Sequence, residues 1–383
     1  MSTVSSHVGA LALKTATEYP LPADEQTHEI VAPCDGLLLI SQQPHSALVK
    51  MQLDPATGRP IAAVRHTIEN AFVGLHGLHV SHRHKGCVWA TLQFVSELVL
   101  IDPRGADPDE PPQLLQRVPL PSPAKGPHVV IEDGDDLWAS CKDSHHVVRI
   151  NPDRPADHSI FPCHPRPIFV AVHPQSRDVY ATLDQSSAIF RVIRSGPPEQ
   201  LGKTATIPVP PERGSTPVGM IPGPDGNVWF VLLGGANGGQ GRFGRITADA
   251  QIQWFQLKSG AAMGASLIHL GFEPDAQAPG ATERIFLLGS SMASMMALNA
   301  VFDVGLSGGY TKIETQQTIA FPSQNSMSHR VLPTRHGLYA TELGACAVVH
   351  LAPAYSPYGE GINEMSDPYA LWGCAVPKGR VDY

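Results

Sequence analysis

A β-hairpin pattern recurs along this chain of 383 residues and limits the folds open to it. Three copies align as a turn, a short strand with an aromatic residue, a polar stretch and a second apolar strand: GCVWATLQFVSELVLIDP, DDLWASCKDSHHVVRINP and RDVYATLDQSSAIFRVI. The aromatic residues Trp89, Trp138 and Tyr180 each stand seven positions before a small or polar residue. A fixed register of this kind predicts a β-hairpin in each copy.

Four looser copies extend the repeat over most of the chain. They are anchored at Leu39, Trp229, Phe286 and Tyr339. The seven anchors follow one another at intervals of 50, 49, 42, 49, 57 and 53 residues, which suits four short strands with their turns. Further strands are legible between the hairpins, at 116–121, 205–210 and 252–257. The repeat predicts an all-β fold, a seven-bladed β-propeller with four-stranded blades.

A ring of blades hides its sheet edges only if its ends are joined, often by strands from both termini. Residues 16–22 resemble the outer strands and are predicted to complete the blade nearest the carboxyl terminus. We expect residues 1–383 to form one domain with repeats over about 28–351. The alternative, two domains divided near 194–204, would interrupt a repeat that continues across that segment.

Composition excludes several classes of partner. Charged residues make up 16% of the chain and the formal net charge of −8 is thinly spread, without the basic runs that bind nucleic acid. No apolar run is long enough to span a membrane, and no secretory signal is evident. The six cysteines lack metal-site spacing and are expected to be reduced, so we expect a cytoplasmic protein.

One repeat resembles a known family. The stretches TPVGMIPGPDGNVWF (216–230) and GRFGRITADAQIQWFQL (241–257) are similar to the repeat unit of the streptogramin (virginiamycin B) lyase propellers. That resemblance implies metal-assisted elimination by a His, a Glu and a second His in the last blade. His329 and Glu342 match the first two positions, but Gly344 stands at the third. A Mg²⁺ site of the family type is therefore not expected, and activity should survive EDTA.

A second resemblance is to fungal propellers of secondary metabolism. Residues 33–55 and 69–81 look similar to hetero-Diels-Alderases of tropolone sesquiterpenoid biosynthesis. This resemblance implies a quinone methide and a medium-ring terpene alkene as substrates, joined through a new dihydropyran ring.

The position of the site follows from the repeat, because the innermost strand of each blade lines the channel of a propeller. In this register those strands begin near His28, His76, His128, Ile168, Val218, Ile268 and His329. Polar residues within the hairpins should lie at the same end: Gln43, Gln93, Lys142, Asp184, Ser290 and Glu342. The predicted functional site is a pocket at this channel mouth.

The channel histidines suit packing and water-bridged hydrogen bonds as well as ligand contact, and both interpretations stay open. We expect no metal ligands and no cofactor, with Mg²⁺ needed only if the lyase alternative holds. Lys142 has two interpretations: at the channel mouth it would polarise a carbonyl of the substrate, or it would be a charge exposed to solvent. Candidate substrate-binding residues are Gln43, Gln93, Asp184, Met220, Met292 and Met295, where adaptable thioethers would suit an apolar ligand.

No GxSxG, Walker or HExxH motif is present, and GGANGGQG (234–241) is interpreted as a hairpin loop, with a lid as the alternative. We expect a cofactor-free pericyclase that holds small apolar organic substrates in a near-attack geometry. The expected hydrogen-bond donors are His76, His128, His329 and Lys142, and Glu342 would act as a base or orient His329. The alternatives are the C–O lyase and a non-catalytic binding module, which the inward position of the polar residues disfavours.

Overall fold

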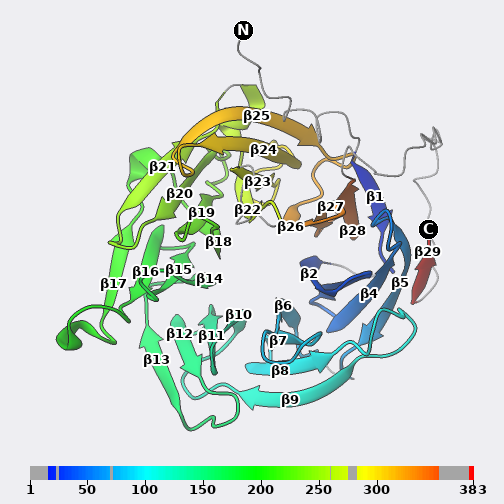
Figure 1. Ribbon diagram of the computed structural model, residues 1–383, viewed down its shortest axis with the longest axis horizontal. Helices are drawn as coiled ribbons and strands as arrows, with labels where there is room; N and C mark the ends of the chain where they lie inside the picture. The colour runs from blue at the N-terminus through cyan, green and yellow to red at the C-terminus, as the bar shows by residue number, and fades with distance from the viewer. Residues whose placement is uncertain (1–15, 23–25, 70–71, 259, 275–282, 353–378) are drawn as a thin grey trace.

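The computed structural model describes residues 16–22, 26–69, 72–258, 260–274, 283–352 and 379–383. Its strands form seven antiparallel sheets arranged as blades around a central channel (Figure 1). Six blades have four strands, and the first blade has a fifth. The predicted seven-bladed β-propeller is confirmed, and the fifth strand is an addition to it.

Each blade runs from an innermost strand at the channel to an outermost strand at the rim. The innermost strands are β2 (Thr27–Cys34), β6 (Leu75–Val80), β10 (Pro127–Asp133), β14 (Pro167–Val172), β18 (Pro217–Pro222), β22 (Leu267–Phe272) and β26 (Ser328–Thr334). The second strands are β3 (Leu37–Gln42), β7 (Val88–Leu92), β11 (Asp136–Cys141), β15 (Val179–Leu183), β19 (Val228–Leu232), β23 (Arg284–Gly289) and β27 (Gly337–Glu342). The third strands are β4 (Ala47–Leu53), β8 (Glu97–Asp102), β12 (His146–Ile150), β16 (Ala188–Val192), β20 (Arg242–Ile246), β24 (Ala300–Ser307) and β28 (Ala347–Leu351). The outermost strands are β5 (Pro60–Thr67), β9 (Gln113–Pro119), β13 (His158–Pro162), β17 (Thr204–Pro208), β21 (Ile252–Gln256), β25 (Lys312–Ala320) and β1 (Thr17–Pro20).

The ring is closed by the amino-terminal strand. β1 pairs with β28, placing Thr17 opposite His350, and so completes the seventh blade as predicted for residues 16–22. The fifth strand of the first blade, β29 (Arg380–Asp382), pairs with β5 at the neighbouring rim (Figure 1). Both terminal strands therefore cover sheet edges at the junction of the last and first blades.

The fixed register of the hairpins has a backbone cause. In five blades the residue seven positions after the anchor adopts a positive φ: Ser46, Ser96, His145, Ser187 and Cys346. A left-handed residue at this point ends the turn and starts the third strand. The Oγ atoms of Ser46 and Ser187 also accept hydrogen bonds from the loop that enters the next blade.

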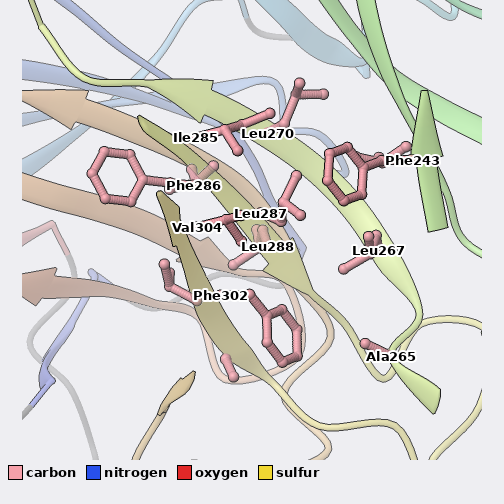
Figure 2. Packing of buried hydrophobic residues seen from close by; sticks show 14 of the residues in the cluster. Phe243, Ala265, Leu267, Leu270, Ile285, Phe286, Leu287, Leu288, Phe302 and Val304 are labelled. Carbon is pink, nitrogen blue, oxygen red and sulfur yellow. The ribbon is translucent and has the colours of Figure 1, made fainter. Parts of the chain in front are cut away.

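The core lies between adjacent blades. All seven anchors are buried, and the tryptophans Trp89, Trp138 and Trp229 are among the largest fully buried side chains. Figure 2 shows this packing around the sixth blade, where Phe286, Leu287 and Phe302 belong to one apolar cluster. The aromatic positions of the repeat therefore serve packing between sheets.

The helices among the described residues are three short 3-10 turns, η1 (Pro198–Gln200), η2 (Pro211–Arg213) and η3 (Gly260–Gly264). The segment 194–204 joins β16 to β17 inside one sheet. Within the described ranges there is no helix with the length and apolar character needed to cross a membrane. Cys374 and residues 1–15 lie outside the described residues.

Candidate functional site

The innermost strands share an irregularity that shapes the channel. In every blade the pairing with the second strand shifts just after the first residue of the innermost strand, as between Leu75 and Leu78 or between Ser328 and Arg330. The residue after that first position is left out of the regular ladder. In four blades this residue is a histidine, and each of these histidines lies where the sequence predicted the start of an innermost strand: His28, His76, His128 and His329.

These histidines form a buried cluster. The ring centroids of His76 and His128 are 4.0 Å apart, and His28 lies 4.4 Å from His76 and 4.8 Å from His329. None of the four residues is more than 7% exposed. His76, His128 and His329 lie on innermost strands, within the channel as predicted, and their role in a reaction stays a prediction.

Three of the rings are oriented by the next blade. Nδ1 of His76 bonds to the carbonyl oxygen of His128 at 3.0 Å, Nδ1 of His128 to that of Ile168 at 3.0 Å, and Nδ1 of His329 to that of His28 at 3.2 Å. A carbonyl oxygen only accepts hydrogen bonds, so Nδ1 carries the proton in each ring. In the neutral ring Nε2 is then an unprotonated acceptor.

The rings are held neutral by their surroundings. Burial lowers the pKa of His28 to about 3, with a further lowering from the positive charges of Arg330 and Lys142. Burial likewise lowers the pKa of His76, His128 and His329 well below the usual range of histidine. All four imidazoles are therefore uncharged at neutral pH.

A buried ion pair follows the histidines along the channel. Arg330 Nε donates to Glu29 Oε2 at 2.7 Å, a second contact joins Arg330 Nη2 to Glu29 Oε1, and Nη1 donates to the carbonyl of His329 at 3.0 Å. The Arg330 guanidinium lies 4.2 Å from the ring centroid of Phe169, and the Phe169 ring is 5.6 Å from that of His269. Burial raises the pKa of Glu29, and Arg330 opposes that shift.

A pocket of about 480 Å³ occupies the channel on the far side of this ion pair. It is lined by the later residues of the innermost strands, including the apolar side chains of Leu78, Val129, Ile131, Met220, Ile221 and Leu332. Arg330, Glu29, Phe169 and His269 form its border with the histidine cluster. Its size falls within the range of about 300–1,000 Å³ typical of small-molecule sites.

The hairpin residues lie at the histidine end of the channel. Gln43 Nε2 donates to Gln93 Oε1 at 2.7 Å, and Asp184 accepts from Arg166 Nη2 at 2.7 Å. Lys142 is half-buried, and burial lowers its pKa. The charge of Lys142 acts on the histidine cluster and contributes to the lowered pKa of His28, whereas the pocket is formed where the innermost strands end.

Glu342 points away from that channel. Its Oε1 accepts a hydrogen bond from Ser326 Oγ, and it interacts with Glu18 of β1. Burial raises the pKa of Glu342 to about 8. No hydrogen bond joins Glu342 to His329 in the part of the chain that the structure describes.

The remaining predicted residues are dispersed. Met220 lines the pocket, whereas Met295 is 76% exposed and Met292 packs beside the core cluster of the sixth blade. Ser290 is buried and accepts a hydrogen bond from the Met292 amide. Met220 is therefore the one predicted substrate-binding residue that belongs to the lining of this pocket.

Sequence reasoning missed Arg330, Glu29, Phe169 and His269. A signal for the first two was present, because Glu29 directly follows His28 and Arg330 directly follows His329. Opposite charges at one position of two innermost strands, in a chain with few charged residues, are a sign of a buried pair.

Comparisons with known proteins bear on the fold. No family model matches the chain, and no curated protein does. A catalytically inactive virginiamycin B lyase from Staphylococcus aureus, solved with quinupristin, is similar with a TM-score of 0.65 and 17% identity over 88% of this chain and 98% of that one. A streptogramin B lyase structure gives a TM-score of 0.64 and 17% identity over 87% and 96% of the two chains. Hydrazine synthase from Kuenenia stuttgartiensis gives 0.59 and 12% identity over 86% and 96%.

These similarities confirm the expected likeness to streptogramin lyase propellers at the level of the fold. A shared propeller does not assign a reaction, because one fold hosts many chemistries.

Proposed function

We propose that the protein is an enzyme that joins two apolar partners in the channel pocket by a hetero-Diels–Alder cycloaddition. The observation that carries this proposal is the pocket itself: about 480 Å³ with mainly apolar walls and one buried guanidinium at its border. The similarity of residues 33–55 and 69–81 to fungal hetero-Diels-Alderases supplies the expected partners, a quinone methide and a terpene alkene.

Proximity supplies most of the expected acceleration. A bimolecular cycloaddition loses translational and rotational freedom, and a rigid pocket that holds both partners removes that loss from the barrier. The heterodiene contributes C=C–C=O and the alkene C=C, and one new C–C bond and one new C–O bond close the dihydropyran ring. No atom leaves and no cofactor is consumed.

Arg330 is the proposed hydrogen-bond donor to the heterodiene carbonyl. It borders the pocket, and its Nη1 group has one N–H beyond the bond to the His329 carbonyl. His76, His128 and His329 already donate their Nδ1–H groups to carbonyls and present acceptors instead. A charged donor in a water-poor site stabilises the oxygen on which negative charge develops.

The aromatic wall would hold the flat partner. Phe169 lies against the Arg330 guanidinium and is one of the residues that line the pocket, so a planar quinone methide would contact this ring while its carbonyl reaches Arg330. Glu342 does not line this pocket, so it is not placed to act as the base that generates the heterodiene there.

The experiment is a cycloaddition assay with an ortho-quinone methide released in situ and a medium-ring terpene alkene, read by chiral chromatography and mass spectrometry. The wild type should give one enantiomer, whereas Arg330→Lys and Phe169→Ala should give slower and nearly racemic product. Met296→Ala, at a residue 97% exposed, is the matched control and should behave as wild type. Wild-type product that is racemic, or pocket variants with unchanged rate and selectivity, would contradict the proposal.

A metal-assisted C–O lyase is the second candidate. It is favoured by His329, which stands on the last innermost strand at the position of the first family histidine and keeps Nε2 as an unprotonated acceptor. It is disfavoured by Gly344 at the position of the second family histidine. Linearisation of a streptogramin B depsipeptide that EDTA abolishes and Mg²⁺ restores would establish this candidate. Cycloaddition that persists in EDTA would exclude a need for the metal in the proposed reaction.

A further inference from the structure

The histidines of the seventh, first and second blades converge on one point of the channel. His329, His28 and His76 can each offer one ring nitrogen, and the three nitrogens lie within 4.8 Å of one another. We propose that these three histidines bind one divalent transition-metal ion. This inference is independent of the cycloaddition and would hold if another reaction took place in the pocket.

The ring orientations match those of metal ligands. A histidine ligand usually donates its other N–H to a carbonyl or carboxylate, which fixes the ring and leaves one nitrogen for the metal. Nδ1 of His76 and Nδ1 of His329 make such bonds, at 3.0 and 3.2 Å, to the carbonyls of His128 and His28. Their Nε2 atoms are therefore the ligand atoms.

His28 provides the second, independent observation. It is 7% exposed, and neither ring nitrogen has a hydrogen-bond partner within the described residues. An unpaired buried polar group is costly and uncommon in folded proteins. Coordination of an ion would satisfy one of these nitrogens.

The donor set selects the class of ion. Three neutral imidazoles suit Zn²⁺, Cu²⁺, Ni²⁺ or Co²⁺, whereas Mg²⁺ and Ca²⁺ require oxygen ligands. Tetrahedral coordination at about 2.0–2.1 Å needs donors about 3.3 Å apart, so the rings must approach one another slightly. The neighbouring positive charge of Arg330 is balanced by Glu29, which lowers its repulsion of a cation.

The location suggests what the ion does. His329, His28 and His76 belong to three consecutive blades and span the junction where the ring closes. A shared ion would tie these blades together and stabilise the native state by mass action.

The test is metal titration of protein stripped with EDTA and dialysed. Calorimetry with Zn²⁺ should show one equivalent bound and a raised Tm, and Mg²⁺ should produce neither effect. Co²⁺ should give the visible spectrum of a tetrahedral site, and X-ray absorption at the zinc edge should find three nitrogens at about 2.0–2.1 Å from imidazole rings. These spectroscopic readouts need no variant.

His28→Phe sharpens the test, because it removes the donor together with the unpaired nitrogens and keeps a ring in place. The metal-free variant should be at least as stable as the metal-free wild type, yet bind Zn²⁺ more than about 100-fold more weakly. The control His269→Phe carries the same change at another channel histidine outside the three donors and should bind Zn²⁺ as wild type does. Absence of saturable binding to the wild type, or equal binding by His28→Phe, would overturn the proposal.

Discussion

The two halves of the ring share a backbone and differ in the chemistry at its centre. Blades 7, 1, 2 and 3, counted along the chain from β2, place His329, His28, His76 and His128 at the second position of the innermost strand. Blades 4, 5 and 6 place Ile168, Val218 and Ile268 there. The aliphatic residues join the apolar clusters between blades, so that half of the channel serves packing.

The difference extends to the hydroxyls behind the channel. In the histidine half, Ser41, Thr91, Ser140 and Thr341 each donate to the backbone carbonyl of the next blade's second position. The equivalent residues in blades 5 and 6 are Val231 and Leu288. One repeat therefore supports a polar network behind the channel histidines and aliphatic packing at the equivalent positions of blades 5 and 6, while the pocket takes lining residues from both halves.

The largest expected effect comes from breaking the buried ion pair in the histidine half, and it shows how far the stability of that half depends on paired charges. Arg330→Met leaves the buried Glu29 without its partner and should lower the free energy of unfolding by about 3–5 kcal/mol. The double variant Glu29→Gln, Arg330→Met should recover most of that loss. Denaturant unfolding measures both. Ile268→Val, the control in the aliphatic half, should cost only about 0.5–1.5 kcal/mol. If Arg330→Met lowered the free energy of unfolding as little as Ile268→Val does, the two halves would not differ in how they are stabilised.

The hydroxyl network predicts a graded effect. Thr341 Oγ1 donates to the His28 carbonyl at 2.7 Å and accepts from the Arg330 amide at 3.0 Å, so Thr341→Val should cost about 1–3 kcal/mol. Among the described residues, Thr182 Oγ1 makes one hydrogen bond, which it accepts from the Phe169 amide at 3.2 Å, so Thr182→Val should cost less. The same unfolding measurement ranks the two variants, and the reverse order would show that the network does not set the difference.

Stability should fall with rising pH because of Glu342. Burial raises its folded-state pKa to about 8, so between about pH 4.5 and 8 the unfolded chain loses a proton that the folded protein keeps. Glu342 should therefore lower the free energy of unfolding by at most about 1.4 kcal/mol for each pH unit of increase in this range. Glu342→Gln should flatten the slope of unfolding free energy between pH 5 and pH 8. If the free energy of unfolding of Glu342→Gln kept the wild-type dependence on pH, the group responsible for that dependence would not be Glu342.

The smallest expected effect concerns the apolar rim. Met295 is 76% exposed, so Met295→Ala should change the unfolding free energy by less than about 0.5 kcal/mol. It should also leave the cycloaddition rate unchanged, since Met295 does not line the pocket. A decrease in product selectivity would extend the substrate site to this rim.

The repeat made most of the architecture predictable. Strand order and the starts of the innermost strands follow from the register of the aligned hairpins, and closure follows from the likeness of residues 16–22 to the outer strands. β29 could not be predicted, because three residues without a repeat partner carry no pattern.

The site was predictable only in part. The sequence located the histidines at the channel but not the end at which a pocket is open, because that depends on how the rings fill the space between strands. The Glu29–Arg330 pair is 301 residues apart along the chain and forms only when the ring closes. A contact between residues so far apart produces no local pattern in the sequence from which it could be predicted.

Closure through β1 also constrains the order of folding. Because synthesis begins at the amino terminus, Thr17–Pro20 must wait unpaired until β28, near the other end of the chain, has formed. The entropy of closing so long a loop is lost before the pairing gains any contact, so we expect ring closure to be the slow step of refolding. Until then β28 exposes an open edge that β1 of a second molecule can also occupy, so refolding at high protein concentration should yield some dimers that have exchanged this strand.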